Sequence, residues 1–577
     1  MWTTAIGTAL LTLTTTLAPL PAGVRWASDC TAGPPYQCAT LTVPLDHDAP
    51  DGPRIDLRLI RRPAAGARIG TLFLHSGGPG EALTDTLPKL YARIPAAVRE
   101  RFDVVGFDQR GVGQSTAVQC FDTLADQQRV LASIPAGFPL GRAEERATEA
   151  AYLRFAAACR ERAGDLLPHM STANTARDLD LIRQALGEPT LTYYGLSYGT
   201  FLGATYANLF PGRIRAMVLD AVLEPVAYTT GRGGEGRRLS TALRLGEDVE
   251  RRRVFNRFLD LCAEAGPSRC PFAAPPNPLP NPRPAEAGRA EPGLGEARRV
   301  GTRRIETARA GKRRIAARVE AARVETRRIA ARVEAARVEA ARVETRRKYA
   351  ELTARLAEGP IRAGDEVFTR ATAMAAVAQA MDVVEPLPGY VDHGWPQAAR
   401  LLQTLWLARD TPIPAAPRQK APGQNPADRY AGLEQAGAVV CAETDRPAPA
   451  TFPGQAEWAA RRSGDFGRLA TWRLAPCSVW PTMDADRYTG PWNRRTAAPI
   501  LVMSTTHDPA DPYRNARRLT RELSRARLLT VDGYGHGVIL NPSTCADRHQ
   551  TAYLINGTLP PEGAVCTQDA APFQGLR

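Results

Sequence analysis

Short apolar segments, each about as long as one β-strand, constrain the fold of this chain more than any other feature. They alternate with helical or glycine-rich stretches and lie at residues 70–75, 102–108, 190–194, 216–220, 499–504 and 526–531. Apolar strands that alternate with helical patterns are typical of a parallel sheet covered on both faces. The sequence therefore predicts an α/β fold with a doubly wound, mostly parallel sheet.

Residues 226–490 interrupt this alternation for longer than any loop in a compact domain. Two stretches in it, Leu243–Cys262 and Phe368–Met381, have helical patterns. We interpret this part as a helical cap inserted over the carboxyl edge of the sheet. The core would then consist of residues 28–225 and 491–577.

The charge of the chain is concentrated in one insertion. The formal net charge is +14, but residues 298–348 alone hold 18 Arg and Lys against 6 Glu, which leaves +2 for the rest. This distribution argues against a nucleic-acid-binding body. The block follows a proline-rich linker (residues 271–292) and repeats the unit RRIAARVEAARVE, whose residues favour helix. No heptad seam forms, so a solvated helix is predicted; a tether to an anionic surface or nucleic acid is the alternative.

The ten cysteines fall into neighbouring couples along the chain. None has CxxC spacing and the histidines do not cluster with them, so no metal site is expected. Five sequential disulfides are predicted, with ten reduced thiols as the alternative: Cys30–Cys38, Cys120–Cys159, Cys262–Cys270, Cys441–Cys477 and Cys545–Cys566. Disulfides require an oxidising compartment. Residues 1–27 resemble a signal peptide that lacks a basic start, and no other stretch is apolar enough to span a membrane, so secretion is expected.

Residues 195–199 read Gly-Leu-Ser-Tyr-Gly, the G-x-S-x-G pattern of a nucleophilic serine, between an expected strand and an expected helix. A serine nucleophile needs a histidine base and a carboxylate that orients it. His536 follows the last apolar segment between two glycines, and Asp508 follows the one before it, with Asp511 as a rival acid. The sequence thus predicts a triad of Ser197, His536 and an acid, whereas His507 shares the acid's loop and is set aside.

An oxyanion requires two backbone donors. The amide of Tyr198 directly follows the nucleophile. The second donor is expected in the glycine-rich loop after the first apolar segment, where Gly78 is our choice.

Several motifs occur together in a fixed order. They are GGPG at 77–80, DQRGVGQS at 108–115, GLSYGT at 195–200, DPADPY at 508–513 and GYGHG at 533–537. Together they resemble the secreted tripeptidyl aminopeptidases of actinomycetes, which are α/β-hydrolases similar to proline iminopeptidases. The resemblance covers about Cys30 to Cys566, without roughly residues 272–358, and its acid-loop pattern D-P-x-T-P favours Asp508.

This resemblance implies a peptidase without metal or organic cofactor that acts on peptides with a free N-terminus. Carboxylates of the cap would hold the substrate's amine, and Glu224 and Asp445 are the candidates. The chain departs from the family where Glu81 and Ala82 replace the usual Gly and Ser, and where Asp511 replaces the Thr of the acid loop. An esterase with the same triad, or a catalytically silent binding protein that uses the basic repeat, are the alternatives. Neither the side-chain preference nor the oligomeric state follows from the sequence.

Overall fold

The computed structural model describes residues 23–28, 30–275, 304–386, 393–408 and 433–574. The side chains of residues 304–315 and 433 are also outside the description. Most of the expected signal peptide and of the proline-rich linker therefore lies outside the described residues.

A nine-stranded sheet forms the centre of the described chain, in the order β1-β2-β4-β3-β5-β6-β9-β10-β11. All six strands expected from the apolar segments are present and parallel: β3 (Gly70–His75), β4 (Phe102–Phe107), β5 (Leu191–Leu196), β6 (Ile214–Asp220), β9 (Ile500–His507) and β10 (Ala526–Tyr534). The prediction of a mostly parallel α/β sheet is confirmed. A short strand, β11 (Val565–Thr567), extends it in parallel beside β10.

Two further strands, β1 (Gln37–Pro44) and β2 (Arg54–Arg62), form an antiparallel edge that the apolar segments did not reveal. Their side chains alternate between buried and exposed positions because only one face of this edge is covered. Arg110 fixes the end of β1: it pairs with Asp178 through two nitrogens at 2.7 Å and donates to the carbonyls of Pro44 and Leu45.

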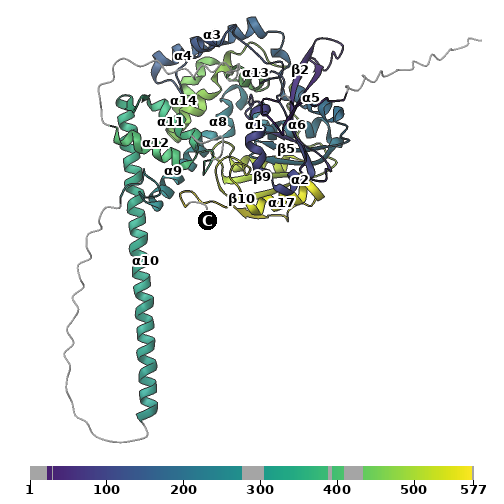
Figure 1. Cartoon of the computed structure of the whole chain (residues 1–577). Helices are drawn as coiled ribbons and strands as arrows, with labels where there is room; N and C mark the ends of the chain where they lie inside the picture. The colour runs from purple at the N-terminus through teal and green to yellow at the C-terminus, as the bar shows by residue number, and fades with distance from the viewer. Residues whose placement is uncertain (1–22, 29, 276–303, 387–392, 409–432, 575–577) are drawn as a thin grey trace, which may run out of the picture.

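Helices cover both faces of the sheet (Figure 1). One face packs on α4 (Gly141–Ala163), α5 (Thr172–Ala185), α6 (Tyr198–Leu209) and α16 (Tyr513–Glu522). The other face packs on α1 (Leu83–Leu90), α2 (Ala96–Arg101) and α17 (Thr544–Asn556). The apolar side chains of both strand faces are thereby buried, which is the main driving force for this arrangement.

The chain between β6 and β9 is largely helical and has a hydrophobic core of its own, centred on Phe255, Phe258 and Trp395. Its helices include α7 (Pro225–Thr229), α8 (Thr241–Leu245), α9 (Glu247–Ala265), α11 (Arg370–Ala380), α12 (Trp395–Leu407), α13 (Leu433–Glu443), α14 (Phe452–Ser463) and α15 (Asp465–Arg473). We call this part the cap. A two-stranded ladder, β7 (Ile361–Ala363) with β8 (Glu366–Phe368), also belongs to it.

The basic repeat forms one long helix, α10 (Arg304–Glu358), which projects from the body as a rod (Figure 1). Every described side chain from residue 316 to 337 is exposed, as the prediction of a solvated helix requires. Its last turns are different, because Tyr349, Leu352 and Leu356 are buried in the core of the cap. Among the side chains that the structure describes, those that anchor the rod therefore lie toward its carboxyl end.

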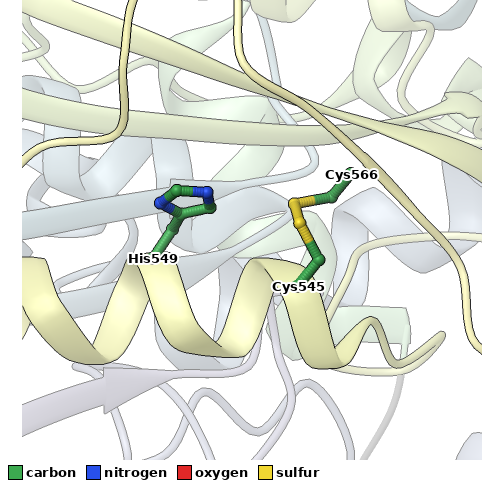
Figure 2. A group of neighbouring side chains, drawn as sticks. All are labelled: Cys545, His549 and Cys566. Carbon is green, nitrogen blue, oxygen red and sulfur yellow. A yellow bond between two sulfur atoms is a disulfide. The ribbon is translucent and has the colours of Figure 1, made fainter.

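All ten cysteines are paired, and the five disulfides are those predicted from sequence neighbours. Figure 2 shows one of them, Cys545–Cys566, with His549 one turn further along α17. These three side chains come close enough to share a metal ion. The sulfur atoms of the two cysteines are joined in a disulfide, however, whereas a metal ion binds cysteine as a thiolate.

Candidate active site

Ser197 lies in a sharp turn between β5 and α6. Its backbone has φ 56° and ψ −122°, a conformation rare for a residue with a side chain, and its amide donates to the carbonyl of Asp220 at 2.9 Å. The turn needs small neighbours: a Cβ on Gly195 would collide with the carbonyl oxygen of Gly199, and one on Gly199 would lie 2.7 Å from that of His75. The G-x-S-x-G motif thus holds the serine at the carboxyl end of the sheet.

The last two long strands bring His536 and Asp508 together. The imidazole Nδ1 of His536 lies 3.1 Å from both carboxylate oxygens of Asp508. Asp508 is fully buried and accepts hydrogen bonds from the amides of Ala510, Asp511 and Gly537 at 2.8–3.1 Å. Because three backbone amides hold this carboxylate in place, it can fix both the orientation and the tautomer of the imidazole.

Burial alone would lower the pKa of His536, but the carboxylates of Asp508, Asp511 and Asp382 together outweigh it, and the pKa rises to about 10. Ser197 and His536 line the same cavity, of about 280 Å³. The fold therefore brings the serine and the histidine that were expected to act as nucleophile and base into one cavity. Their common cavity is where a substrate carbonyl would enter.

Asp511, the rival acid, lies in a second position beside the same ring. Its Oδ2 is 4.0 Å from the Nδ1 of His536 and has no hydrogen-bond partner among the described residues. Burial raises its pKa to about 7, an effect that His536 opposes and Asp508 supports. The direct hydrogen bonds belong to Asp508, so the geometry favours Asp508 as the orienting residue. His507 instead contacts Thr506 and the ring of Tyr534.

The glycine-rich loop after β3 approaches the nucleophile closely. A Cβ on Gly77 would lie 2.9 Å from the Cβ of Ser197 and 3.4 Å from the amide nitrogen of Tyr198. The amide of Gly77 donates to the ring of His75, whereas Gly78, with φ 100°, lines the cavity together with Ser197. The amides of Gly78 and Tyr198 have no acceptor among the described residues. Both remain available to an oxyanion.

The two carboxylates expected to hold a substrate amine lie elsewhere. Glu224 is fully buried and is the N-cap residue of α7, where its carboxylate accepts hydrogen bonds from the amides of Val226 and Ala227. It also pairs with Arg232 at 2.8 Å. Asp445 pairs with Arg487 at 2.9 Å. Neither residue lines a cavity that contains Ser197. Both carboxylates form ion pairs with arginines of this chain, and the fold does not place them beside Ser197.

Two family models match the chain, one described as alpha/beta hydrolase fold over residues 70–231 and one as TAP-like protein over residues 463–566. The chain is 31% identical to the serine protease Hip1 of Mycobacterium tuberculosis over 542 residues, which cover 92% of this chain and 87% of that protein. The chain belongs to the tripeptidyl-aminopeptidase-like family of α/β-hydrolases.

Other relatives carry different activity names. The tripeptidyl aminopeptidase of Streptomyces coelicolor is 27% identical, covering 96% of this chain and 87% of that protein. Carboxylesterase B of M. tuberculosis is also 27% identical, covering 92% and 86%. Among solved structures, a proline iminopeptidase of Mycobacterium smegmatis matches at 13% identity and a TM-score of 0.31, over 89% of this chain and 97% of that chain.

The family resemblance did not point to the charged residues that the cap places at the site. Arg251 pairs with Glu247 at 2.9 Å and with Asp382 at 3.3 Å, and Arg473 pairs with Glu247 at 2.7 Å. These residues line the cavities that contain Ser197. Their order along the chain follows no motif, because they come from three separate cap helices or their ends. Sequence spacing therefore carried no signal for them.

A buried carboxyl group links the cap to the nucleophile's turn. Glu443, at the end of α13, accepts hydrogen bonds from the amide and hydroxyl of Thr172 at 2.9 and 2.8 Å and from the hydroxyl of Tyr228 at 2.9 Å. The Thr172 hydroxyl also lies 2.5 Å from that of Tyr198, directly after the nucleophile. Burial raises the pKa of Glu443 to about 8. It lies two residues before Asp445, which sequence reasoning chose instead.

Proposed function

We propose that this chain is a secreted serine exopeptidase that releases short peptides from free N-termini, with Ser197, His536 and Asp508 as its triad. The observation that carries the proposal is the shared cavity of Ser197 and His536, with the ring of His536 held by the buried carboxylate of Asp508. Membership of a family with named serine peptidases supports the reaction class. The five disulfides fit an oxidising compartment outside the cell.

In the proposed mechanism, the hydroxyl of Ser197 attacks the scissile carbonyl while Nε2 of His536 takes its proton. Asp508 holds the proton on Nδ1 and stabilises the imidazolium that forms. The oxyanion accepts hydrogen bonds from the amides of Tyr198 and Gly78. The imidazolium then protonates the leaving amine, and a water molecule, deprotonated by the same ring, hydrolyses the acyl-enzyme.

The cap accounts for the preference for chain ends in this proposal. Arg251, Gln379 and Asp382 come from the cap and form part of the wall of the catalytic cavity. Ala436 and Val440 of α13 form part of the wall of the adjoining cavity, of about 460 Å³, which Ser197 also lines. A polypeptide that had to continue in both directions would meet these walls. A chain end would not.

An esterase is the second candidate, because a relative of equal identity to the tripeptidyl aminopeptidase is named a carboxylesterase. Amides and esters are cleaved by the same triad chemistry, and the fold does not distinguish them. The amine leaving group needs protonation by His536 more than an alcohol does. The relative rates on matched amides and esters therefore separate the two candidates.

The test is the release of nitroaniline from a tripeptide anilide with a free N-terminus, from its N-acetylated twin, and of nitrophenol from the corresponding ester. We expect cleavage of the free anilide and little of the acetylated one. Ser197→Ala should abolish turnover, whereas Ser133→Ala, at an exposed position two residues after the end of α3 (Leu124–Leu131), should retain it. Equal rates on free and acetylated anilides, or activity on the ester alone, would refute the exopeptidase.

A further inference from the structure

Glu81 is a carboxylate beside the nucleophile that the proposed mechanism does not use. It directly follows Gly77-Gly78-Pro79-Gly80 and lines both cavities that contain Ser197. A Cβ on Gly78 would lie 3.3 Å from the Cγ of Glu81, so the side chain runs back along the loop that supplies the oxyanion donor. Its carboxylate is therefore within one side-chain length of the position of the reacting carbonyl.

The carboxylate of Glu81 has little to bind within the protein. Its one hydrogen bond in the described part of the chain comes from the hydroxyl of Ser76 at 3.3 Å, and no described Lys or Arg nitrogen lies within 4.0 Å of it. The surface of the side chain remains open to the cavity. Burial raises the pKa of Glu81, while the hydrogen bond from Ser76 and the positive charges of His536 and Lys89 oppose this shift, so a further cationic group close to the carboxylate would favour its ionised form.

The other charges of the two cavities are already balanced. Arg251 and Arg473 are paired with Glu247, and Arg251 also with Asp382. Asp511 is buried and faces His536. Glu81 is thus the carboxylate of the cavity walls that is accessible and forms no ion pair within 4.0 Å among the described residues, since the charges of His536 and Lys89 act on it only from a greater distance. An ionised carboxylate in such a position binds an ammonium or guanidinium group strongly.

We propose that Glu81 binds a cationic group on a substrate residue that adjoins the scissile bond, and so makes this chain selective for such substrates. This inference rests on the proposed hydrolase site. An extended chain advances by about 3.3–3.6 Å per residue, so the amine of a three-residue acyl group lies roughly 10 Å from the cut, beyond a side chain at Glu81. The cation is therefore either the side chain of a Lys or Arg next to the scissile bond, or the α-ammonium group of a single N-terminal residue that the cleavage releases.

The first arm of the test compares Lys with norleucine at the residue before the cut, in anilides of fixed length and in the matching esters. We expect Glu81→Gln to lower kcat/KM for the Lys substrates by about 10- to 100-fold, the loss typical of one charge-assisted contact, and to spare the norleucine substrates. The second arm compares alanine anilide and alanine ester with their N-acetylated forms. A loss confined to the free forms would assign the cation to the α-ammonium.

Asp85→Asn is the matched control, because it removes the same charge from the exposed face of α1, four residues further along. Melting curves show whether each variant is folded. An enzyme that cleaves only esters would refute the exopeptidase, while the ester series would still measure the role of Glu81. If a folded Glu81→Gln variant keeps the wild-type ratio in both arms, Glu81 binds no substrate cation and the inference is wrong.

Discussion

Replacing Asp511 by Asn should move the acid limb of the pH–rate profile to lower pH. In the proposed mechanism the base is the neutral imidazole of His536, and the carboxylates of Asp508 and Asp511 both stabilise its protonated form. The acid limb of kcat/KM reports the pKa of this base in the free enzyme. Removal of the charge on Asp511 leaves the hydrogen bonds of Asp508 in place and lowers the pKa of His536.

The size of the shift follows from the distance. Two unit charges at about 4 Å interact by roughly 4 kcal/mol at an effective dielectric constant of about 20, or about 3 pKa units at the most. The carboxylate of Asp511 is 4.0 Å from Nδ1 and lacks a direct hydrogen bond to it. Screening by the cavity reduces this bound, and we expect a fall of about 1–2 units.

The assay is kcat/KM for the free tripeptide anilide from pH 5 to pH 11, for the wild type, for Asp511→Asn and for Asp51→Asn. Asp51 lies in an exposed turn far from the site along the chain, so its variant controls for the change in net charge. Asp511→Glu keeps the charge and should keep the limb near its wild-type position. An acid limb that coincides for Asp511→Asn and the wild type would show that Asp511 does not act on His536.

Three further outcomes are expected. Arg110→Gln should lower the free energy of unfolding by about 3–5 kcal/mol in urea titrations, because it removes the charged partner of the fully buried Asp178. Arg129→Gln, at an exposed pair with Asp126, should change it by less than about 1 kcal/mol. The folded state keeps Glu443 protonated to higher pH than the unfolded state does, so the resulting contribution to stability is fully present below the ordinary pKa of 4.5 and is lost as pH rises through about 8. The melting temperature of Glu443→Gln should therefore fall less than that of the wild type between pH 5 and pH 9. A parallel fall of the two would contradict the raised pKa. Deletion of residues 304–338 should leave kcat/KM unchanged, since the described side chains there are almost all exposed; a large loss would give the rod a role in catalysis.

The core of the fold could be predicted because six of the parallel strands are continuous apolar segments, several of which end at a motif rich in glycine or proline. The segments at 70–75 and 102–108 match β3 and β4 to within a residue. The edge strands β1 and β2 could not be found in this way, because a strand with one covered face mixes charged and apolar residues. The same local logic located Ser197, Asp508 and His536.

The cap was predictable only as a helical insertion. Contacts between its helices and the core join residues more than 200 positions apart, as in the hydrogen bond from Thr172 to Glu443. A single sequence carries no record of such pairings. Glu224 and Asp445 were therefore chosen by residue type and proximity to motifs, while the carboxylates that line the cavity include Glu81 and Glu247.

The rod of α10 has a consequence for how this chain can change in evolution. One 14-residue copy of its repeat adds about 21 Å of helix at 1.5 Å per residue. From residue 316 to 337 each described side chain faces solvent, so an added or lost copy leaves the packing of the body untouched. Copy number in this segment is thus nearly neutral for stability. Unequal exchange between the repeated codons can lengthen or shorten the rod while the hydrolase core stays under selection.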